Sequence, residues 1–379
     1  MKKLHIIFTA SFINSLMLNG MLLAIVFYAK TRFGASPTQT GEIVFFYNLA
    51  YVAGCVFAQS LLSRFSPQKN LVISMLCFFG GSLLCYFGKG MSWLYLGQLC
   101  FGIGTSFFWP PLMGWFSEGY EGKQLARMAG YYNLTWSTAN FITPLMMGAL
   151  CDLNETYPLI LLVVIYAIQL PVFIAIHLAN RKQATQATQQ EHPVRGKETM
   201  LRFPSWYGVA CAWCVIGFLL GVYPNAAKEL LNISSARVGF FYTLRSTGQA
   251  IALVALGLFT FWQFKRWQLA VGHFATAIVT FTLGFAKSEM LVLVCLILLG
   301  PLFAHAYTNS LVHGVAGSKN RTRRAAIHEI LLSSGSLLGA LVGGYLYQHF
   351  GLVAACSFCA LLMTSAAICD LFPWKDKTA

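Results

Sequence analysis

Apolar stretches of about 20 residues recur along nearly the whole chain, and each is long enough to cross the hydrocarbon core of a bilayer as a helix. Of the 379 residues, 57% are hydrophobic and only 10% are charged. A soluble domain carries roughly 25% charged residues, so a water-soluble fold is excluded. We predict an all-α membrane protein with helices at residues 4–29, 39–62, 70–88, 92–116, 126–151, 157–179, 204–224, 236–261, 267–286, 290–313, 325–348 and 351–371.

The first apolar stretch begins with two lysines, as a signal peptide does, but it continues to Tyr28 without a small-residue cleavage site. We therefore expect it to be the first spanning helix.

The basic residues gather on one side of the predicted helices. Alternate connections hold nineteen of the 26 Lys and Arg residues, Arg245 lies inside a helix, and six lie on the other side, namely Lys30, Arg32, Lys89, Lys228, Arg237 and Lys287. By the positive-inside rule both termini face the cytoplasm, in a multi-pass protein of the plasma membrane or a bacterial inner membrane. The net charge of +14 thus indicates topology, and nucleic acid is not an expected partner.

A polar segment divides the chain into two similar halves. Residues 181–203 have the Gln, Thr and charge content of a flexible cytoplasmic linker between six-helix bundles at 1–180 and 204–379. A weak repeat relates the halves. A shift of 196 places Gly148 on Gly344 and the segment 127–133 on 323–329, and a shift of 198 places Gly41 on Gly239 and Gly102 on Gly300. Equivalent helices run the same way, so the repeat is parallel.

These features resemble the major facilitator superfamily over essentially the whole length. That family has a Gly-x-x-x-Asp-Arg-x-Gly-Arg-Arg signature between helices 2 and 3 and an echo between helices 8 and 9. Here the first copy keeps Arg64, and the second keeps Gly257 and the pair Lys265-Arg266 without the Asp. The pattern LGQLCFGIGTSFFWPPLMGWF in helix 4 and the small residues of helix 11 also fit. The resemblance implies two six-helix bundles and secondary transport by alternating access.

Ionisable residues at membrane depth are costly and mark functional candidates. Arg245 should lie about 14 Å inside the membrane, where its guanidinium can anchor a carboxylate or phosphate or act as a structural partner. His328 and Glu329 could carry a coupling proton, although Glu329 could instead stabilise the start of its helix. Glu42, near the outer start of helix 2, has the same two interpretations.

The resemblance implies that helices 1, 4, 7 and 10 line a central cavity, and their polar and aromatic residues are candidates for solute binding. The predicted binding set, with helix 5 added, is Arg245, Asn14, Asn19, Gln98, Trp109, Asn133, Trp136, Trp213, His305, Tyr307 and Asn309. Amides, aromatic rings and one arginine suit a small polar, and in particular an anionic, organic solute. Each side chain could equally join helices by hydrogen bonds.

No metal, cofactor or enzymatic activity is expected. The pairs Cys211/Cys214 and Cys356/Cys359 should lie at different depths, and the GxxxxGK[ST], HExxH and GxSxG motifs are absent. We expect a monomer that moves a small molecule, with a proton gradient or the solute's own gradient as the energy source. Two alternatives stay open, an exporter of hydrophobic compounds and a membrane enzyme or assembly protein on a transporter scaffold.

Overall fold

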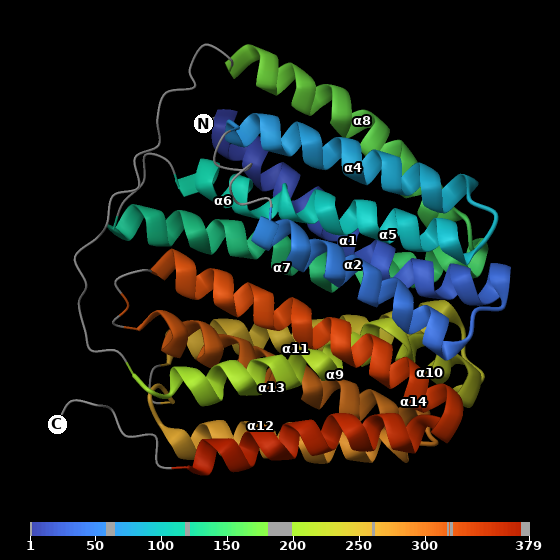
Figure 1. Ribbon diagram of the computed structural model, residues 1–379, viewed down its shortest axis with the longest axis vertical. Coiled ribbons are helices and arrows are strands. Elements are labelled where there is room, and N and C mark those ends of the chain that lie inside the picture. The colour runs from blue at the N-terminus through green and yellow to red at the C-terminus, as the bar shows by residue number, and fades with distance from the viewer. Residues whose placement is uncertain are drawn as a thin grey trace. The chain divides into compact units, whose positions relative to one another are not determined.

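The computed structural model describes residues 2–57, 65–117, 122–180, 199–259, 262–316, 318 and 321–372, and within them it contains helices and no strand (Figure 1). The elements are α1 (Lys2–Phe33), α2 (Pro37–Phe57), α4 (Pro67–Phe87), α5 (Met91–Ser106), α6 (Trp109–Ser117), α7 (Gly122–Leu153), α8 (Tyr157–Asn180), α9 (Arg202–Gly221), α10 (Tyr223–Leu231), α11 (Ser235–Leu258), α12 (Arg266–Gly284), α13 (Glu289–Val315) and α14 (Arg321–Leu371).

The predicted all-α membrane fold is confirmed. When α5–α6 and α9–α10 are each taken as one broken helix and α14 as two helices, the described residues form the twelve predicted helices. The break within α14 is at Gly351, whose φ of 83° is left-handed and requires a glycine. The eighth predicted helix, at 236–261, corresponds to α11, which ends at Leu258, three residues before the predicted end. The linker 181–203 lies mostly outside the described residues.

Local sequence explains where several helices begin. Ser66 accepts a hydrogen bond from the backbone N–H of Lys69 and is followed by Pro67, which is the usual start of a helix. Ser288 caps α13 in the same way through the N–H of Leu291, and Glu289 adds a favourable negative charge in the first turn.

Seven of the described helical segments are long and apolar enough to cross a membrane by themselves. Two helices also carry exposed apolar stripes with the spacing of a helix face. The stripe of α8 consists of Ile160, Val164, Ile168 and Val172, and that of α12 consists of Val271, Phe274, Ile278 and Phe281. Such surfaces are suited to lipid, because in water they would have to be covered by another protein.

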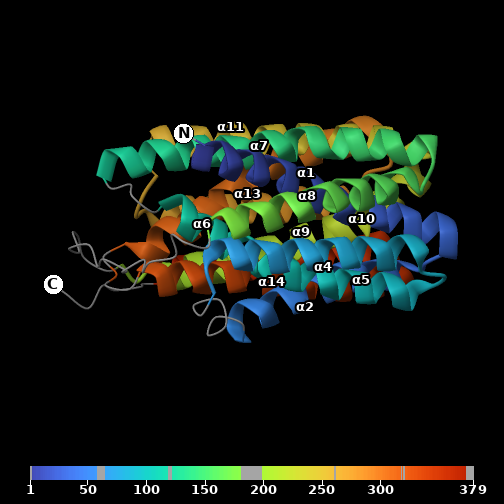
Figure 2. The same cartoon turned by 90° about the horizontal axis from the view of Figure 1, so that it is seen from above.

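The helices form two units. Unit 1 contains residues 1–35, 46–189 and 234–243, and unit 2 contains residues 36–45, 190–233 and 244–379. In unit 1, α1 packs along α7, and α4 packs against both α5 and α8, as both views show (Figures 1 and 2). In unit 2, α14 packs along α9 and α12, and α13 contacts α9, α12 and α14. Residues 36–45 of α2 and residues 234–243 of α11 therefore fall in a different unit from the rest of their helices.

The glycine pairs of the sequence repeat make equivalent contacts. A Cβ atom on Gly102 would clash with the carbonyl oxygen of Tyr47, and a Cβ on Gly300 would clash with that of Arg245, 198 residues after Tyr47. Gly41 packs in the same way on Ala340, and Gly239 on Pro144. The repeat is thus expressed as equivalent close helix crossings, within each half of the sequence for Gly102 and Gly300 and from one half to the other for Gly41 and Gly239.

Gly148 and Gly344 complete this pattern. Gly148 packs on the backbone of Ser235 at the start of α11, and Gly344 packs on the backbone of Pro37 at the start of α2. Pro37 and Ser235 are again 198 residues apart. Small residues at these positions let helix backbones approach closely where lipid supplies little hydrophobic driving force.

Candidate functional site

The two asparagines predicted on helix 1 have different surroundings in unit 1. Asn14 is fully buried, and its Nδ2 donates to Oε1 of Gln169 on α8 at 2.9 Å. It also donates to the carbonyl of Ala10, at 2.9 Å. Asn19 is exposed, and its Nδ2 donates to Oδ1 of Asn140 on α7 at 2.6 Å. Asn14 therefore joins α1 to α8, whereas the pair of Asn19 and Asn140 presents amide groups at the surface of the unit.

The other candidates of unit 1 are spread over three helices. Gln98 is fully buried on α5 and its Nε2 lies 3.0 Å from Sδ of Met21 on α1. Trp109, the first residue of α6, is half-buried and makes an edge contact with Phe108. Trp136 on α7 is half-buried, and the side chain of Asn133 lies outside the described residues. Their roles in binding stay predictions.

Arg245 is half-buried on α11, within unit 2. Its Nη2 donates to Oγ of Ser246 at 3.3 Å, and its guanidinium carbon lies 5.9 Å from the ring centroid of Phe303 on α13. This distance is within the range of a cation–π interaction. Because an arginine side chain stays charged in proteins, the side chain keeps a cation beside α13.

Two aromatic candidates of unit 2 lie together. The rings of Trp213 on α9 and Tyr307 on α13 are 5.7 Å apart, and both side chains are half-buried. Tyr307 also makes an edge contact with the ring of His328, at 4.8 Å. These three side chains therefore lie close together, and their roles in binding and proton coupling stay predictions.

His328 and Glu329 have different surroundings, and their role in proton coupling stays a prediction. His328 is buried, with Nδ1 2.8 Å from Oγ of Ser310, whereas Glu329 is exposed. The physical reason is helix geometry, since consecutive residues point about 100° apart around the axis. Glu42 is half-buried and is the sixth residue of α2, because the helix begins at Pro37, two residues before the predicted start. It therefore lies beyond the first turn, where a helix dipole acts most strongly.

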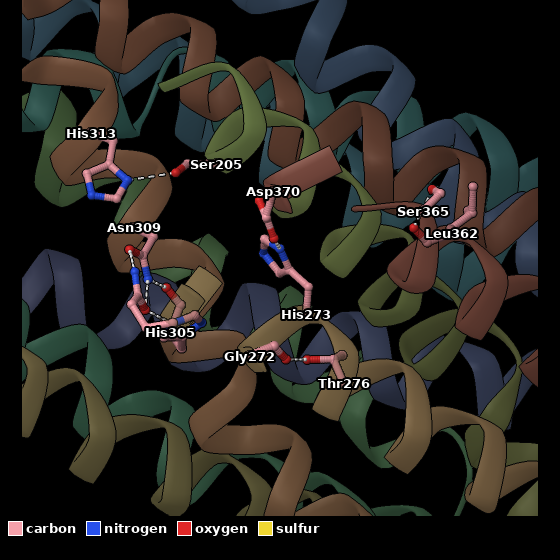
Figure 3. Close-up of polar contacts among 11 residues, drawn as sticks. Ser205, Gly272, His273, Thr276, His305, Asn309, His313, Leu362, Ser365 and Asp370 are labelled. Atoms are coloured by element: carbon pink, nitrogen blue, oxygen red, sulfur yellow. Dashed lines mark hydrogen bonds and ion pairs between the residues drawn. The ribbon is translucent and has the colours of Figure 1, made fainter. Parts of the chain in front are cut away.

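His305 and Asn309 belong to a polar cluster inside unit 2 (Figure 3). Nδ2 of Asn309 donates to the carbonyl of His305 at 2.9 Å, so its Oδ1 is the atom that accepts from Nε2 of Gln268, at 2.8 Å. Oε1 of Gln268 then faces Nε2 of His305. This chain of hydrogen bonds requires the neutral His305 to carry its proton on Nε2.

His313 lies two turns after His305 on the same face of α13 and is fully buried. The backbone N–H of Phe264 donates to Nε2 of His313 at 3.1 Å. Nδ1 of His313 must then carry the proton and donate it to Oγ of Ser205, 2.7 Å away on α9. One imidazole thus fixes the start of α9 and the chain that leads into α12.

The third part of the cluster is a contact between an imidazole and a carboxyl group. Nδ1 of His273 on α12 lies 2.7 Å from Oδ2 of Asp370 near the end of α14, and the two side chains are 1% and 0% exposed (Figure 3). The ring of His273 is 6.3 Å from that of His305. Gly208 on α9 and Gly272 on α12 leave room for the two rings, since a Cβ atom at either glycine would clash with the imidazole.

Sequence reasoning missed Gln268, His273, His313 and Asp370 as members of a cluster. A signal was present, because His273 and Asp370 are polar residues inside the predicted helices 267–286 and 351–371. Their pairing spans 97 residues and could not be read from spacing. The binding candidates were sought mainly on the helices expected to line a cavity, and α12 and the second half of α14 are not among those helices.

The cysteines are packing groups in the part of the chain that is described. All eleven are free thiols, and Cys211, Cys214, Cys356 and Cys359 are buried. No set of three or more His, Cys, Asp or Glu side chains suited to a metal ion occurs among the described residues.

Comparison with known families decides which family this arrangement represents. The profile of the Major Facilitator Superfamily matches residues 7–224 and residues 205–377. The chain belongs to the Major Facilitator Superfamily. No curated protein sequence matches it significantly.

Solved structures with this major facilitator fold match the chain over nearly its whole length. The nucleoside transporter NupG is 11% identical, with all of both chains covered and a TM-score of 0.76. A peptide transporter POT mutant in complex with alafosfalin is 12% identical, with 98% of this chain and 93% of that chain covered and a TM-score of 0.78. A bacterial homologue of the human lysosomal transporter Spinster is 14% identical, with 97% and 94% covered and a TM-score of 0.72. At these identities the likeness shows the fold.

The second signature loop of this family member lacks the Asp, and other groups hold its described part. Nε1 of Trp262 donates to the carbonyls of Phe259 and Leu256 near the end of α11, at 2.6 and 3.1 Å. Nη1 of Arg266 donates to the carbonyl of Phe372 at 2.9 Å. With the bond from Phe264 to His313, these contacts tie this region to the end of α11, to α13 and to the residue that follows α14. The first signature loop lies largely outside the described residues.

Proposed function

We propose that this protein is a secondary transporter that moves a small polar organic solute across the membrane by alternating access. Membership of the Major Facilitator Superfamily and the equivalent helix crossings of the two sequence halves support this function. The energy would come from a proton gradient or from the solute's own gradient. The protein would act as a monomer in the plasma membrane or a bacterial inner membrane, with both termini cytoplasmic, as the distribution of basic residues favours.

The observation that carries the solute class is Arg245. A half-buried guanidinium in a membrane helix is costly and is usually kept because it serves a function. The guanidinium of Arg245 lies beside the ring of Phe303 and the hydroxyl of Ser246. A guanidinium binds carboxylates and phosphates through two parallel hydrogen bonds. We therefore favour an anionic group on the solute. Within the same unit as Arg245, Trp213 and Tyr307 offer aromatic surface.

The first experiment is a thermal-shift screen of the purified protein against sugars, organic acids, amino acids, dipeptides, nucleosides and phosphates. A compound that binds only the folded protein raises its melting temperature, by an amount that grows with concentration over Kd.

Compounds that raise the melting temperature are then tested for uptake into proteoliposomes with Arg245→Ala and Arg245→Lys. Arg237→Ala is the matched control, since Arg237 is exposed on the same helix and its guanidinium lies near Phe240 and Phe241. We expect uptake to fall at least tenfold in Arg245→Ala, partly recover in Arg245→Lys and remain normal in Arg237→Ala. Uptake that is unchanged in Arg245→Ala would remove this role.

The contact of Arg245 with Phe303 also favours a second candidate, in which the arginine is a structural tie and the aromatic residues bind hydrophobic compounds for export. Susceptibility of cells to a panel of amphipathic drugs, with and without the protein, separates the two. If no compound in the panel shows a difference, the exporter hypothesis fails.

A further inference from the structure

His273 and Asp370 differ from the other buried polar groups of unit 2 because one of them is an acid. The other three imidazoles contact neutral side chains. His305 contacts Gln268, His313 contacts Ser205, and His328 contacts Ser310. Among the described residues no Lys or Arg forms an ion pair with Asp370, and His273 is its only ion-pair partner. The charge of this carboxylate is therefore balanced only when the imidazole beside it is protonated.

The surroundings of the pair supply no other compensating charge among the described residues. The titratable groups around it include Cys211 on α9, His305 on α13 and Cys369 on α14, with Tyr207 beside Cys211. Tyr207 is engaged with Ser365, and His305 with Gln268. Arg266 on α12 donates to the carbonyl of Phe372.

Charge balance then determines how many protons the pair prefers. A neutral imidazole with a carboxylate carries one negative charge, which is strongly disfavoured away from water. One added proton makes the pair neutral, either as imidazolium with carboxylate or as imidazole with carboxylic acid. Removing water from the pair therefore favours proton uptake, and letting water in favours release.

Acceptor atoms are available for this proton. Nε2 of His273 and Oδ1 of Asp370 are buried and have no hydrogen-bond partner among the described residues. Addition of a proton at either atom forms one N–H or O–H bond, and the proton comes from hydronium and returns to water. His305 does not take up a second proton easily, because a second imidazolium would lie 6.3 Å from the first, centroid to centroid.

We propose that the His273–Asp370 pair is a proton-binding site that holds one exchangeable proton, and that this proton is the coupling ion of the carrier. The use of the proton for coupling rests on the proposed transport function. We favour this site over His328 and Glu329, the pair predicted from the sequence, because His273 and Asp370 contact each other directly.

The test counts protons and needs no solute. The purified full-length protein in detergent is titrated from about pH 9 to about pH 5, and the protons bound per molecule are compared with those of Asp370→Asn and His273→Gln. Asp152→Asn is the matched control, because it also removes one carboxylate, but an exposed one that stays ionised in this range. Melting temperature and gel filtration show whether each variant is folded.

We expect wild-type protein and Asp152→Asn to bind one proton more over this range than Asp370→Asn. His273→Gln should show the same loss, because a buried carboxylic acid without its imidazole stays protonated. If one variant does not fold, the other decides. A pair with only a structural role would lower the melting temperature and leave the proton count at the wild-type value, and that result would overturn the proposal. Failure of the uptake assay would contradict the proposed function without altering this count, so the two failures can be told apart.

Discussion

Asp152 and Gln348 are 196 residues apart, and each accepts a backbone hydrogen bond from the start of another helix. Within unit 1, the two carboxylate oxygens of Asp152 accept from the N–H groups of Ser235 and Ala236 at 2.7 and 2.8 Å. Within unit 2, Oε1 of Gln348 accepts from the N–H of Thr38 at 3.2 Å. The repeat has thus placed a charged cap at the start of α11 and a neutral one at the start of α2.

We predict that Asp152→Asn loosens the contact between the end of α7 and the start of α11. Losing the charge and one acceptor from a helix start costs about 1 kcal/mol, which is roughly a fivefold change in population. Spin labels on cysteines introduced at Asn154 and Arg237, both exposed, should report a longer or broader distance distribution. Glu155→Gln removes a neighbouring charge and should leave the distribution unchanged, and an equal change in both variants would argue against the cap.

The pH dependence of this contact follows from the pKa of Asp152. Partial burial raises the pKa, but hydrogen bonds from Ala236, Ser234 and Ser235 outweigh it and hold the pKa below its ordinary range. The contribution of the carboxylate is therefore present at neutral pH and is lost as the pH falls through that lowered pKa, below about 3.9. The label distances should accordingly stay constant from neutral pH down to about pH 5.

Gly102→Ala and Gly300→Ala should destabilise the protein to a similar extent. Each new methyl group would clash with a backbone carbonyl, that of Tyr47 or that of Arg245, and overpacking of this kind costs about 1–3 kcal/mol. Gly80→Ala is the control, because a Cβ atom there has open space. Its melting temperature should equal or exceed that of the wild type, since alanine favours a helix. A normal melting temperature for Gly102→Ala or Gly300→Ala would mean that the crossings can relax.

His313→Ala should free the chain that leads into α12. The substitution leaves the N–H of Phe264 and the hydroxyl of Ser205 without their present partner, and the loss at the buried Ser205 costs about 1–3 kcal/mol. Limited proteolysis should then cut the connection between α11 and α12 faster than in wild-type protein. His349→Ala, at an exposed histidine of α14, should be cut at the wild-type rate. Equal rates for the two variants would show that His313 does not hold the loop.

The sequence predicted the helices well because each one is a long apolar segment, and membrane helices have little choice of structure. It also predicted the glycine pairs, since equivalent crossings need small residues at equivalent positions. The sequence did not predict contacts between residues that are far apart in the chain. The distance between His273 and Asp370 depends on how α12 packs on α14, and no spacing rule connects residues that far apart.

The candidate site was predicted in part for the same reason. Of the residues that the sequence singled out, Trp213, Tyr307 and His328 lie together, and Arg245 is half-buried. Asn14 and His305 were predicted to bind the solute because their helices were expected to line the cavity. Only one face of such a helix points into a cavity. Their side chains point to Gln169 and Gln268 within their own units, which polarity and depth alone could not reveal.

The central claim is that the protein carries a solute by alternating access, and counterflow in proteoliposomes tests it most directly. Vesicles are loaded with an excess of an unlabelled compound from the thermal-shift screen, and entry of the same compound with a radioactive label is followed without any ion gradient. We predict that the label accumulates transiently above its outside concentration and that its initial entry rate saturates with concentration. Entry that never exceeds the outside level and rises linearly with concentration, for every compound that binds, would contradict a carrier.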